Sequence, residues 1–138
     1  MAFTGNFTCN TFKNGLLDGT FDFGTGTSDT FKIALYTNAA TLDQDTAAYT
    51  ATGEVVASGY TAGGNLLSPT LSIVQGTAFL TFADVTWSAA ITARGALIYK
   101  VGGPAICVLD FGADRISTTQ FKVEFPPNTN TSAIIRLS

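Results

Sequence analysis

The acidic residues are the side chains of this sequence with the most potential for chemistry. Asp43, Asp45 and Glu54 lie in the stretch TLDQDTAAYTATGE, residues 41–54. Asp43 and Asp45 could begin a calcium loop, but Ala47 stands where the third acidic residue should be and the sixth-position glycine is missing, so an EF-hand is excluded. An irregular calcium site stays an alternative. The sequence favours a solvated surface loop whose Asp and Thr side chains form Asx turns and caps, and such a loop could still contact a partner.

Two other carboxylate pairs have the composition of a glycosidase site, since two carboxylates suffice for that reaction. They are Asp18 with Asp22, and Asp110 with Asp114. The first pair lies in an N-terminal arm, which is a poor rigid support for catalysis, and the second flanks Gly112 at a strand end. The chain has no histidine, which removes Ser-His-Asp and Cys-His arrangements. We therefore expect no enzymatic activity, no catalytic residue and no cofactor.

The two cysteines, Cys9 and Cys107, do not indicate a metal site. They lack CxxC spacing and no histidine accompanies them, so we expect no zinc site. The N-terminal sequence MAFTGNFTCN has neither the basic start nor the apolar segment of a signal peptide. Without an export signal, we expect both thiols to stay reduced.

Charge is sparse and scattered. The chain has 138 residues, enough for one domain, and a net charge of −3. Its seven Lys and Arg residues form no cluster, which argues against nucleic acid or a membrane surface as a partner. No apolar run approaches the ~20 residues of a membrane-spanning helix. Only 12% of residues are charged, about half the usual share. We therefore expect part of the surface to consist of Thr, Ser, Asn, Gly and exposed apolar groups, which hints at contact surfaces.

The elements that would position these residues are short β-strands. Apolar residues alternate in FKIALYT, TAFLTFADVTW and QFKVEF, and further strands are predicted in NLLSPTLSIV, ALIYKV, AICVLDF and AIIRLS. Gln75-Gly76 and Gly102-Gly103-Pro104 have the composition of hairpin turns. Seven or eight strands after residue 28 predict an all-β antiparallel sandwich or jelly roll over residues 29–138.

Residues 1–28 are predicted to form an extended arm that holds one short helix. The helix is expected within CNTFKNGLLDG, capped by Asn10 or Thr11 and ended by Gly19. Two alternatives stay open for the arm: it packs on its own domain, or it reaches across a neighbouring molecule. The arm is rich in phenylalanines, namely Phe3, Phe7, Phe12, Phe21 and Phe23.

The strand AICVLDF is apolar on both faces, with Ile106 and Val108 on one side and Cys107 and Leu109 on the other. A short connection makes its hairpin antiparallel, and no long helix is predicted to cover the outer face. The alternatives are cover by the arm, cover by a second subunit or another protein, and an exposed apolar surface that needs no explanation. Trp87 is favoured as a core residue, with an interface anchor as the alternative. The candidate interface residues are therefore the five arm phenylalanines, Ile106, Val108 and Trp87.

Much of the chain resembles a family of small proteins of tailed bacteriophages. The resemblance is carried by the runs FKIALYTNAATLDQDTAAYTATGEVVASGYTAGGNLL and FADVTWSAAITARGALIYK, and by AICVLDFGAD after them. The members of this family are small β-sandwich capsid cement, or decoration, proteins, those of short-tailed phages among them. The resemblance covers about residues 10–138, nearly the whole chain. It carries over no residue-level site.

The resemblance implies a jelly roll on the outer surface of an icosahedral virion head, assembled in the host cytoplasm. Such a protein clamps adjacent major capsid proteins after the shell expands, and pairs with a second copy as a homodimer across local two-fold axes. It implies neither cofactor nor catalytic residue. Two other classes stay open: a tail or fibre component that recognises a host surface sugar, and a head-tail connector or tail structural protein.

Overall fold

Short strands and a single helix make up the described part of the chain. The structure is a computed structural model that describes residues 5–24, 29–126, 129 and 131–137. The elements are β1 (Phe7–Thr8), α1 (Asn10–Asp18), β2 (Phe31–Tyr36), β3 (Asn65–Leu67), β4 (Pro69–Val74), β5 (Thr77–Phe82), β6 (Val85–Trp87), β7 (Thr92–Lys100), β8 (Ala105–Ile116), β9 (Phe121–Val123) and β10 (Ile135–Leu137).

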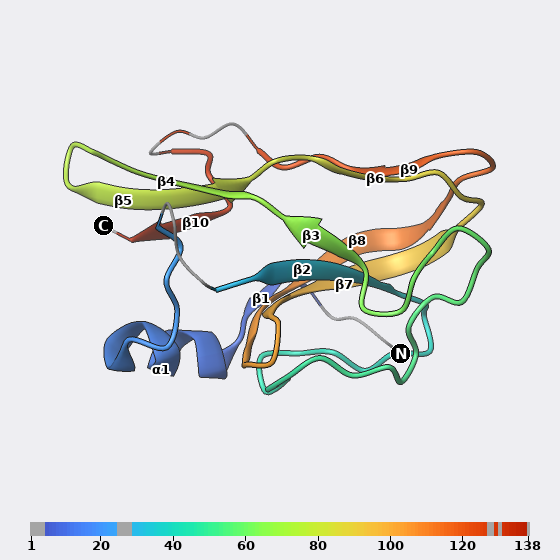
Figure 1. Cartoon of the computed structure of the whole chain (residues 1–138), viewed down its shortest axis with the longest axis horizontal. Coiled ribbons are helices and arrows are strands. Elements are labelled where there is room, and N and C mark those ends of the chain that lie inside the picture. The colour runs from blue at the N-terminus through green and yellow to red at the C-terminus, as the bar shows by residue number, and fades with distance from the viewer. Residues whose placement is uncertain (1–4, 25–28, 127–128, 130, 138) are drawn as a thin grey trace.

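The strands form two facing layers (Figure 1). One layer is a sheet with the order β1-β8-β7-β2-β3, which we call the large sheet; the other holds the order β10-β5-β4 and the pair β6-β9. Every strand pairing in these sheets is antiparallel. The prediction of an all-β antiparallel sandwich with one short helix is therefore confirmed.

Two segments predicted as single strands are each divided into two strands, and one of them changes layer. In NLLSPTLSIV, β3 pairs with β2 in the large sheet, whereas β4 pairs with β5 in the opposite layer. TAFLTFADVTW divides into β5 and β6, which lie in the same layer but in separate sheets. The chain crosses between layers at Ser68, whose carbonyl accepts a hydrogen bond from the Ala83 N–H at 3.1 Å. Nine strands of the described chain therefore follow residue 28, against the seven or eight predicted.

Both predicted hairpin turns are confirmed. The turn between β4 and β5 is Gln75-Gly76, with φ of 50° and 78°, the positive values of a two-residue type I′ turn. Between β7 and β8, Gly102 has a φ of 73°. There the Lys100 N–H donates to the Pro104 carbonyl at 3.0 Å.

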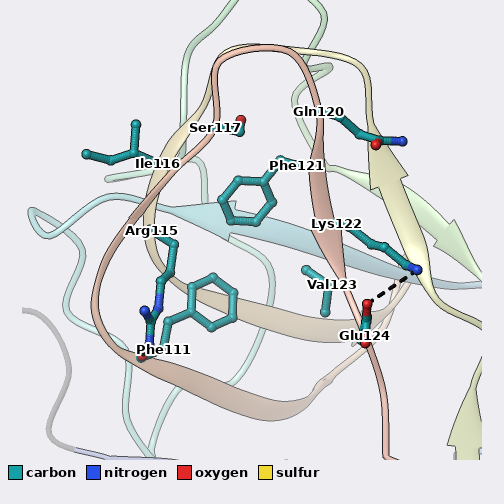
Figure 2. Close-up of a pocket in the computed structure, with 9 residues that line it drawn as sticks. All are labelled: Phe111, Arg115, Ile116, Ser117, Gln120, Phe121, Lys122, Val123 and Glu124. Atoms are coloured by element: carbon teal, nitrogen blue, oxygen red, sulfur yellow. Dashed lines mark hydrogen bonds and ion pairs between the residues drawn. The ribbon is translucent and has the colours of Figure 1, made fainter.

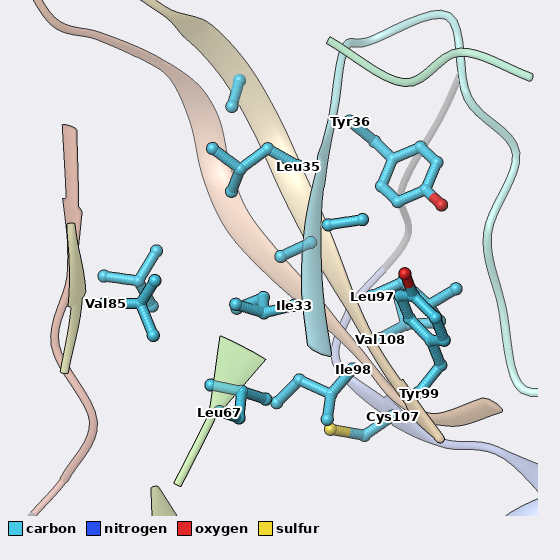
Figure 3. Close-up of a cluster of buried hydrophobic side chains, with 14 of the residues drawn as sticks. Ile33, Leu35, Tyr36, Leu67, Val85, Leu97, Ile98, Tyr99, Cys107 and Val108 are labelled. Carbon is cyan, nitrogen blue, oxygen red and sulfur yellow. The ribbon is translucent and has the colours of Figure 1, made fainter. Parts of the chain in front are cut away.

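The large sheet is buried on both faces. Ile33 and Leu35 project toward the β6–β9 layer and Val85, while Leu97 and Val108 project from the opposite face (Figure 3). Two buried faces explain why the strands of this sheet are apolar throughout rather than strictly alternating.

The N-terminal segment packs on the edge of the large sheet. Phe7 pairs with Val108 through the β1–β8 ladder, and the Cys9 N–H donates to the Ile106 carbonyl at 2.9 Å. Because this last sheet bond falls at Cys9, the N-cap of α1 is Cys9 rather than the predicted Asn10 or Thr11, and it makes no side-chain capping bond.

The end of the helix follows the prediction. Gly19 adopts a φ of 81° and ends α1, as a left-handed C-terminal residue favours glycine. Gly15, an unfavourable residue inside a helix, is explained by close packing. A Cβ at Gly15 would lie 2.4 Å from Cε2 of Phe21.

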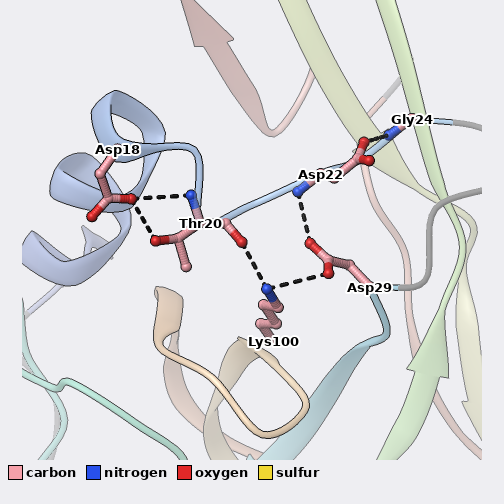
Figure 4. A network of polar contacts seen from close by, with 6 residues as sticks. All are labelled: Asp18, Thr20, Asp22, Gly24, Asp29 and Lys100. Carbon is pink, nitrogen blue, oxygen red and sulfur yellow. Dashed lines mark hydrogen bonds and ion pairs between the residues drawn. The ribbon is translucent and has the colours of Figure 1, made fainter.

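A polar network ties the segment after α1 to the sandwich (Figure 4). The Lys100 ammonium donates to the Thr20 carbonyl at 2.7 Å and pairs with Asp29 Oδ1 at 3.2 Å. The other Asp29 oxygen accepts from the Asp22 N–H at 2.8 Å. Residues 5–24, the described part of the predicted arm, therefore dock on their own domain.

Candidate interaction surfaces

Four of the aspartates considered as catalytic residues or calcium ligands, and disfavoured in those roles, serve local turns. Asp18, Asp22, Asp43 and Asp110 each accept a hydrogen bond from the backbone N–H two residues further along, at 2.8–3.0 Å. This is the Asx-turn geometry expected for residues 41–54. Asp110 also forms an ion pair with Arg94. Within the described residues, no three His, Cys, Asp or Glu side chains gather as a metal site would require.

Glu54 differs from the exposed-loop prediction, because its side chain is only 8% exposed. Its carboxylate accepts hydrogen bonds from the Tyr49 hydroxyl at 2.5 Å, the Tyr60 hydroxyl at 2.6 Å and the Gly63 N–H at 2.8 Å. A buried carboxylate must be satisfied in this way. Glu54 is therefore a structural centre of its loop rather than a solvated residue.

All four tyrosines of the chain fasten this loop. The Tyr36 hydroxyl donates to the Thr50 carbonyl and the Tyr99 hydroxyl to the Gly63 carbonyl, both at 2.7 Å. Burial, together with the Glu54 hydrogen bond, raises the pKa of Tyr49 to about 12, and burial raises the pKa of Tyr60 further still.

The outer face of the large sheet is covered by the chain itself. Residues 37–64 and the N-terminal segment lie along this face (Figure 1), and the Ala105 N–H donates to the Ala47 carbonyl at 2.9 Å. Ile106 and Val108 are 0% exposed as a result. These two interface candidates are thus core residues, because side chains without exposed surface cannot contact a partner.

The aromatic interface candidates also pack within the sandwich. Trp87 is buried, with its ring centroid 6.0 Å from that of Tyr60 and 6.3 Å from that of Phe121, in agreement with the favoured core prediction. Among the arm phenylalanines, Phe12 is buried, and three others are partly buried against the core. These three are Phe7, Phe21 and Phe23. Phe3 lies outside the described residues.

The thiols are equally enclosed. Cys9 and Cys107 are both free and buried. Burial raises the pKa of Cys9 to about 11 and the pKa of Cys107 well above its ordinary value. Neither thiol therefore has the thiolate character of a nucleophile or metal ligand.

Sequence reasoning missed an apolar surface that extends from β4 across β5 to β10. Leu71 is 55% exposed, Ile73 is 72% exposed, and Leu137 on β10 is 55% exposed. We call these three residues the β4 edge patch. The patch borders a small cavity of about 60 Å³ whose lining is entirely apolar. The lining residues are Phe12, Leu16, Phe23, Leu71, Ala78, Phe79, Leu80, Ile135 and Leu137.

The sequence on either side of β4 contains no charged residue. Between Glu54 and Asp84 there is no Asp, Glu, Lys or Arg. Edge strands commonly carry charged side chains that prevent pairing with other molecules, and β4 is an edge strand. The uncharged run was visible in the sequence, but its meaning depends on the sheet order, which alternation alone does not provide.

A second, more polar hollow lies beside the C-terminal half of β8 (Figure 2). Its volume is about 430 Å³. The rings of Phe111 and Phe121 lie 6.2 Å apart, and the ion pair between Lys122 and Glu124 measures 3.4 Å. Arg115 donates to the Phe111 carbonyl at 3.1 Å. This mixture of aromatic and hydrogen-bonding groups could accept a polar ligand.

Comparison of the chain with family models, curated proteins and solved structures gives no match in any of the three. Among the described residues, no helix has the length and apolar character required to cross a membrane.

Proposed function

We propose that this chain is a non-enzymatic virion structural protein, a cement protein on the outside of an assembled phage head. The β4 edge patch is the observation that carries this proposal. Exposed apolar groups gathered around a cavity are typical of a protein-binding surface. The sequence resemblance supplies the partner, the major capsid protein of the same phage, whose adjacent copies the cement protein would clamp.

The stabilising effect would follow from mass action. A protein that binds the assembled shell and not its separate subunits stabilises the shell by RT ln(1 + [L]/Kd). Many repeated sites add avidity, so no single interface needs to be large. The proposal includes a homodimer on the capsid, in which two copies join neighbouring parts of the shell.

Co-sedimentation with expanded capsids that lack this protein tests the proposal. We expect saturable binding to the shells at a fixed ratio to the major capsid protein, and no binding to unassembled capsid protein. Leu137→Lys should weaken binding, because Leu137 belongs to the patch but lies on β10 rather than on the edge strand β4. Val56→Lys is the matched control, because Val56 is 98% exposed and lies outside the β4 edge patch. Absence of binding by the unmodified chain would refute the cement function.

The hollow in Figure 2 favours a second candidate, a tail or fibre component that recognises a host surface sugar. Aromatic rings beside Arg115, Gln120 and Glu124 offer the apolar and hydrogen-bonding contacts that a sugar requires. Titration with host polysaccharide fragments, with Arg115→Ala as the comparison, tests this candidate. A head-tail connector, the remaining class, predicts rings of defined stoichiometry in electron micrographs.

A further inference from the structure

The outer edge of β4 is an open line of backbone hydrogen-bonding groups. In the order β10-β5-β4, β4 has a neighbour on one side only among the residues that the structure describes. The type I′ turn makes Val74 and Thr77 a hydrogen-bonded pair, and such pairs recur at every second residue. The bond from the Ala83 N–H to the Ser68 carbonyl fits this pattern. The N–H and C=O groups of Leu71 and Ile73 therefore point to the open edge.

The side chains of the same two residues define what can pair there. Leu71 and Ile73 stand two residues apart on one face of β4, and both are exposed. No charged residue lies between positions 54 and 84 to repel or attract a charged partner. The edge therefore suits an extended, uncharged strand with alternating apolar side chains.

Among the described strands, β4 fits this description, because it is an edge strand with two exposed apolar side chains on one face. Two identical edges can pair antiparallel about a two-fold axis, so that each satisfies the other. Pro69 provides no N–H, and the turn begins at Gln75. Pairing is therefore centred on residues 71–73.

We propose that β4 pairs antiparallel with β4 of a second copy, with the two-fold axis at Ser72. In this register Leu71 of each copy lies opposite Ile73 of the other copy. Each pair exchanges two backbone hydrogen bonds, so four bonds join the copies. The four apolar side chains gather on one face, next to the small apolar cavity. This inference specifies the homodimer of the proposed function, and depends on that function only for its location on a shell.

Cysteine cross-linking tests the register. Ser72 faces Ser72 of the second copy in a pair without mutual hydrogen bonds, where the Cα atoms lie about 4.5 Å apart, within reach of a disulfide. Thr70→Cys is the control on the same strand and face, because its two copies would lie roughly 13 Å apart, about four residue steps of a strand. Native Cys9 and Cys107 are buried.

We expect Ser72→Cys to form a covalent dimer under mild oxidation, and Thr70→Cys to stay monomeric on a non-reducing gel. Equal cross-linking of both variants, or none of Ser72→Cys, would overturn the proposed register.

Sedimentation equilibrium of the purified chain tests the pairing without engineered thiols. We expect a concentration-dependent dimer whose Kd rises at least about tenfold in Ile73→Lys, an effect of one buried charge at an interface. Leu66→Lys is the control, because Leu66 is 63% exposed but lies on β3 in the large sheet. An unmodified chain that is monomeric at every concentration would refute the pairing.

The dimer and the cement function can fail separately. Sedimentation uses the purified chain without capsids, whereas co-sedimentation measures binding to shells. A dimer that binds no shell would leave the pairing intact and refute the cement function. A monomer that binds shells would refute the pairing and leave binding to the shell intact.

Discussion

Replacement of Glu54 by Gln tests whether the buried carboxylate organises the loop over the large sheet. Glu54 is 8% exposed and accepts three hydrogen bonds, two from tyrosine hydroxyls and one from the Gly63 N–H. Gln preserves the shape and removes the charge. Its amide oxygen can still accept, but its NH₂ group faces a hydroxyl that was donating.

The expected loss follows from the strength of these bonds. A hydrogen bond to a charged group contributes roughly 1.5–3 kcal/mol, against about 1 kcal/mol for a neutral one. Glu54→Gln weakens two such bonds and breaks a third, so we expect the free energy of unfolding to fall by about 3 kcal/mol. For a chain of this size, that corresponds to a decrease in Tm of roughly 10 °C.

Urea unfolding followed by circular dichroism measures this change. Glu124→Gln is the control, since Glu124 is an exposed carboxylate in a surface ion pair with Lys122, and exposed substitutions usually change stability by less than about 0.5 kcal/mol. Tyr60→Phe should also destabilise, because the Tyr60 hydroxyl accepts from the Leu35 N–H at 2.8 Å in addition to its bond to Glu54. If Glu54→Gln matches Glu124→Gln in stability, the carboxylate is not what holds the loop.

Three further predictions follow from the packing. Gly15→Ala should lower the Tm despite the better helix propensity of Ala, because the new Cβ would meet the Phe21 ring at 2.4 Å. Burial and the Glu54 hydrogen bond raise the pKa of Tyr49 to about 12, above its unfolded value of about 10. The unfolded chain therefore loses this proton first, and stability present below pH ~10 should fall as pH rises toward ~12. Phenolate absorbance of the native protein in an alkaline titration checks this prediction. Ionisation of the Tyr49 hydroxyl near pH ~10 in the native protein would contradict it. Cys9 and Cys107, with raised pKa values, should react with a thiol reagent only after unfolding, and rapid native labelling would contradict their burial.

The fold class was predictable because it depends on local patterns. Alternation in FKIALYT and the paired turn residues Gln75-Gly76 each describe a few adjacent residues, and the structure places a strand and a type I′ turn there. Gly19 likewise ends α1 as predicted. Each of these signals requires no knowledge of distant contacts.

The candidate site was not predictable, because it depends on contacts between distant residues. Glu54 is buried after its loop folds back on the large sheet, where the Tyr60 hydroxyl bonds both Glu54 and the distant Leu35 N–H. The strand NLLSPTLSIV gave no indication that it changes layers at Ser68. Without that change, β4 cannot be recognised as an edge, nor Leu71 and Ile73 as exposed.

The contrast between the two apolar surfaces supports a functional role for β4. The chain covers the outer face of the large sheet with residues 37–64 and fastens that cover through four tyrosine hydroxyls and Glu54. At β4 it places neither a covering segment nor a charge among the described residues. An unprotected edge of this kind promotes association. Pairing about a two-fold axis closes that edge after two copies, which allows association without open-ended growth.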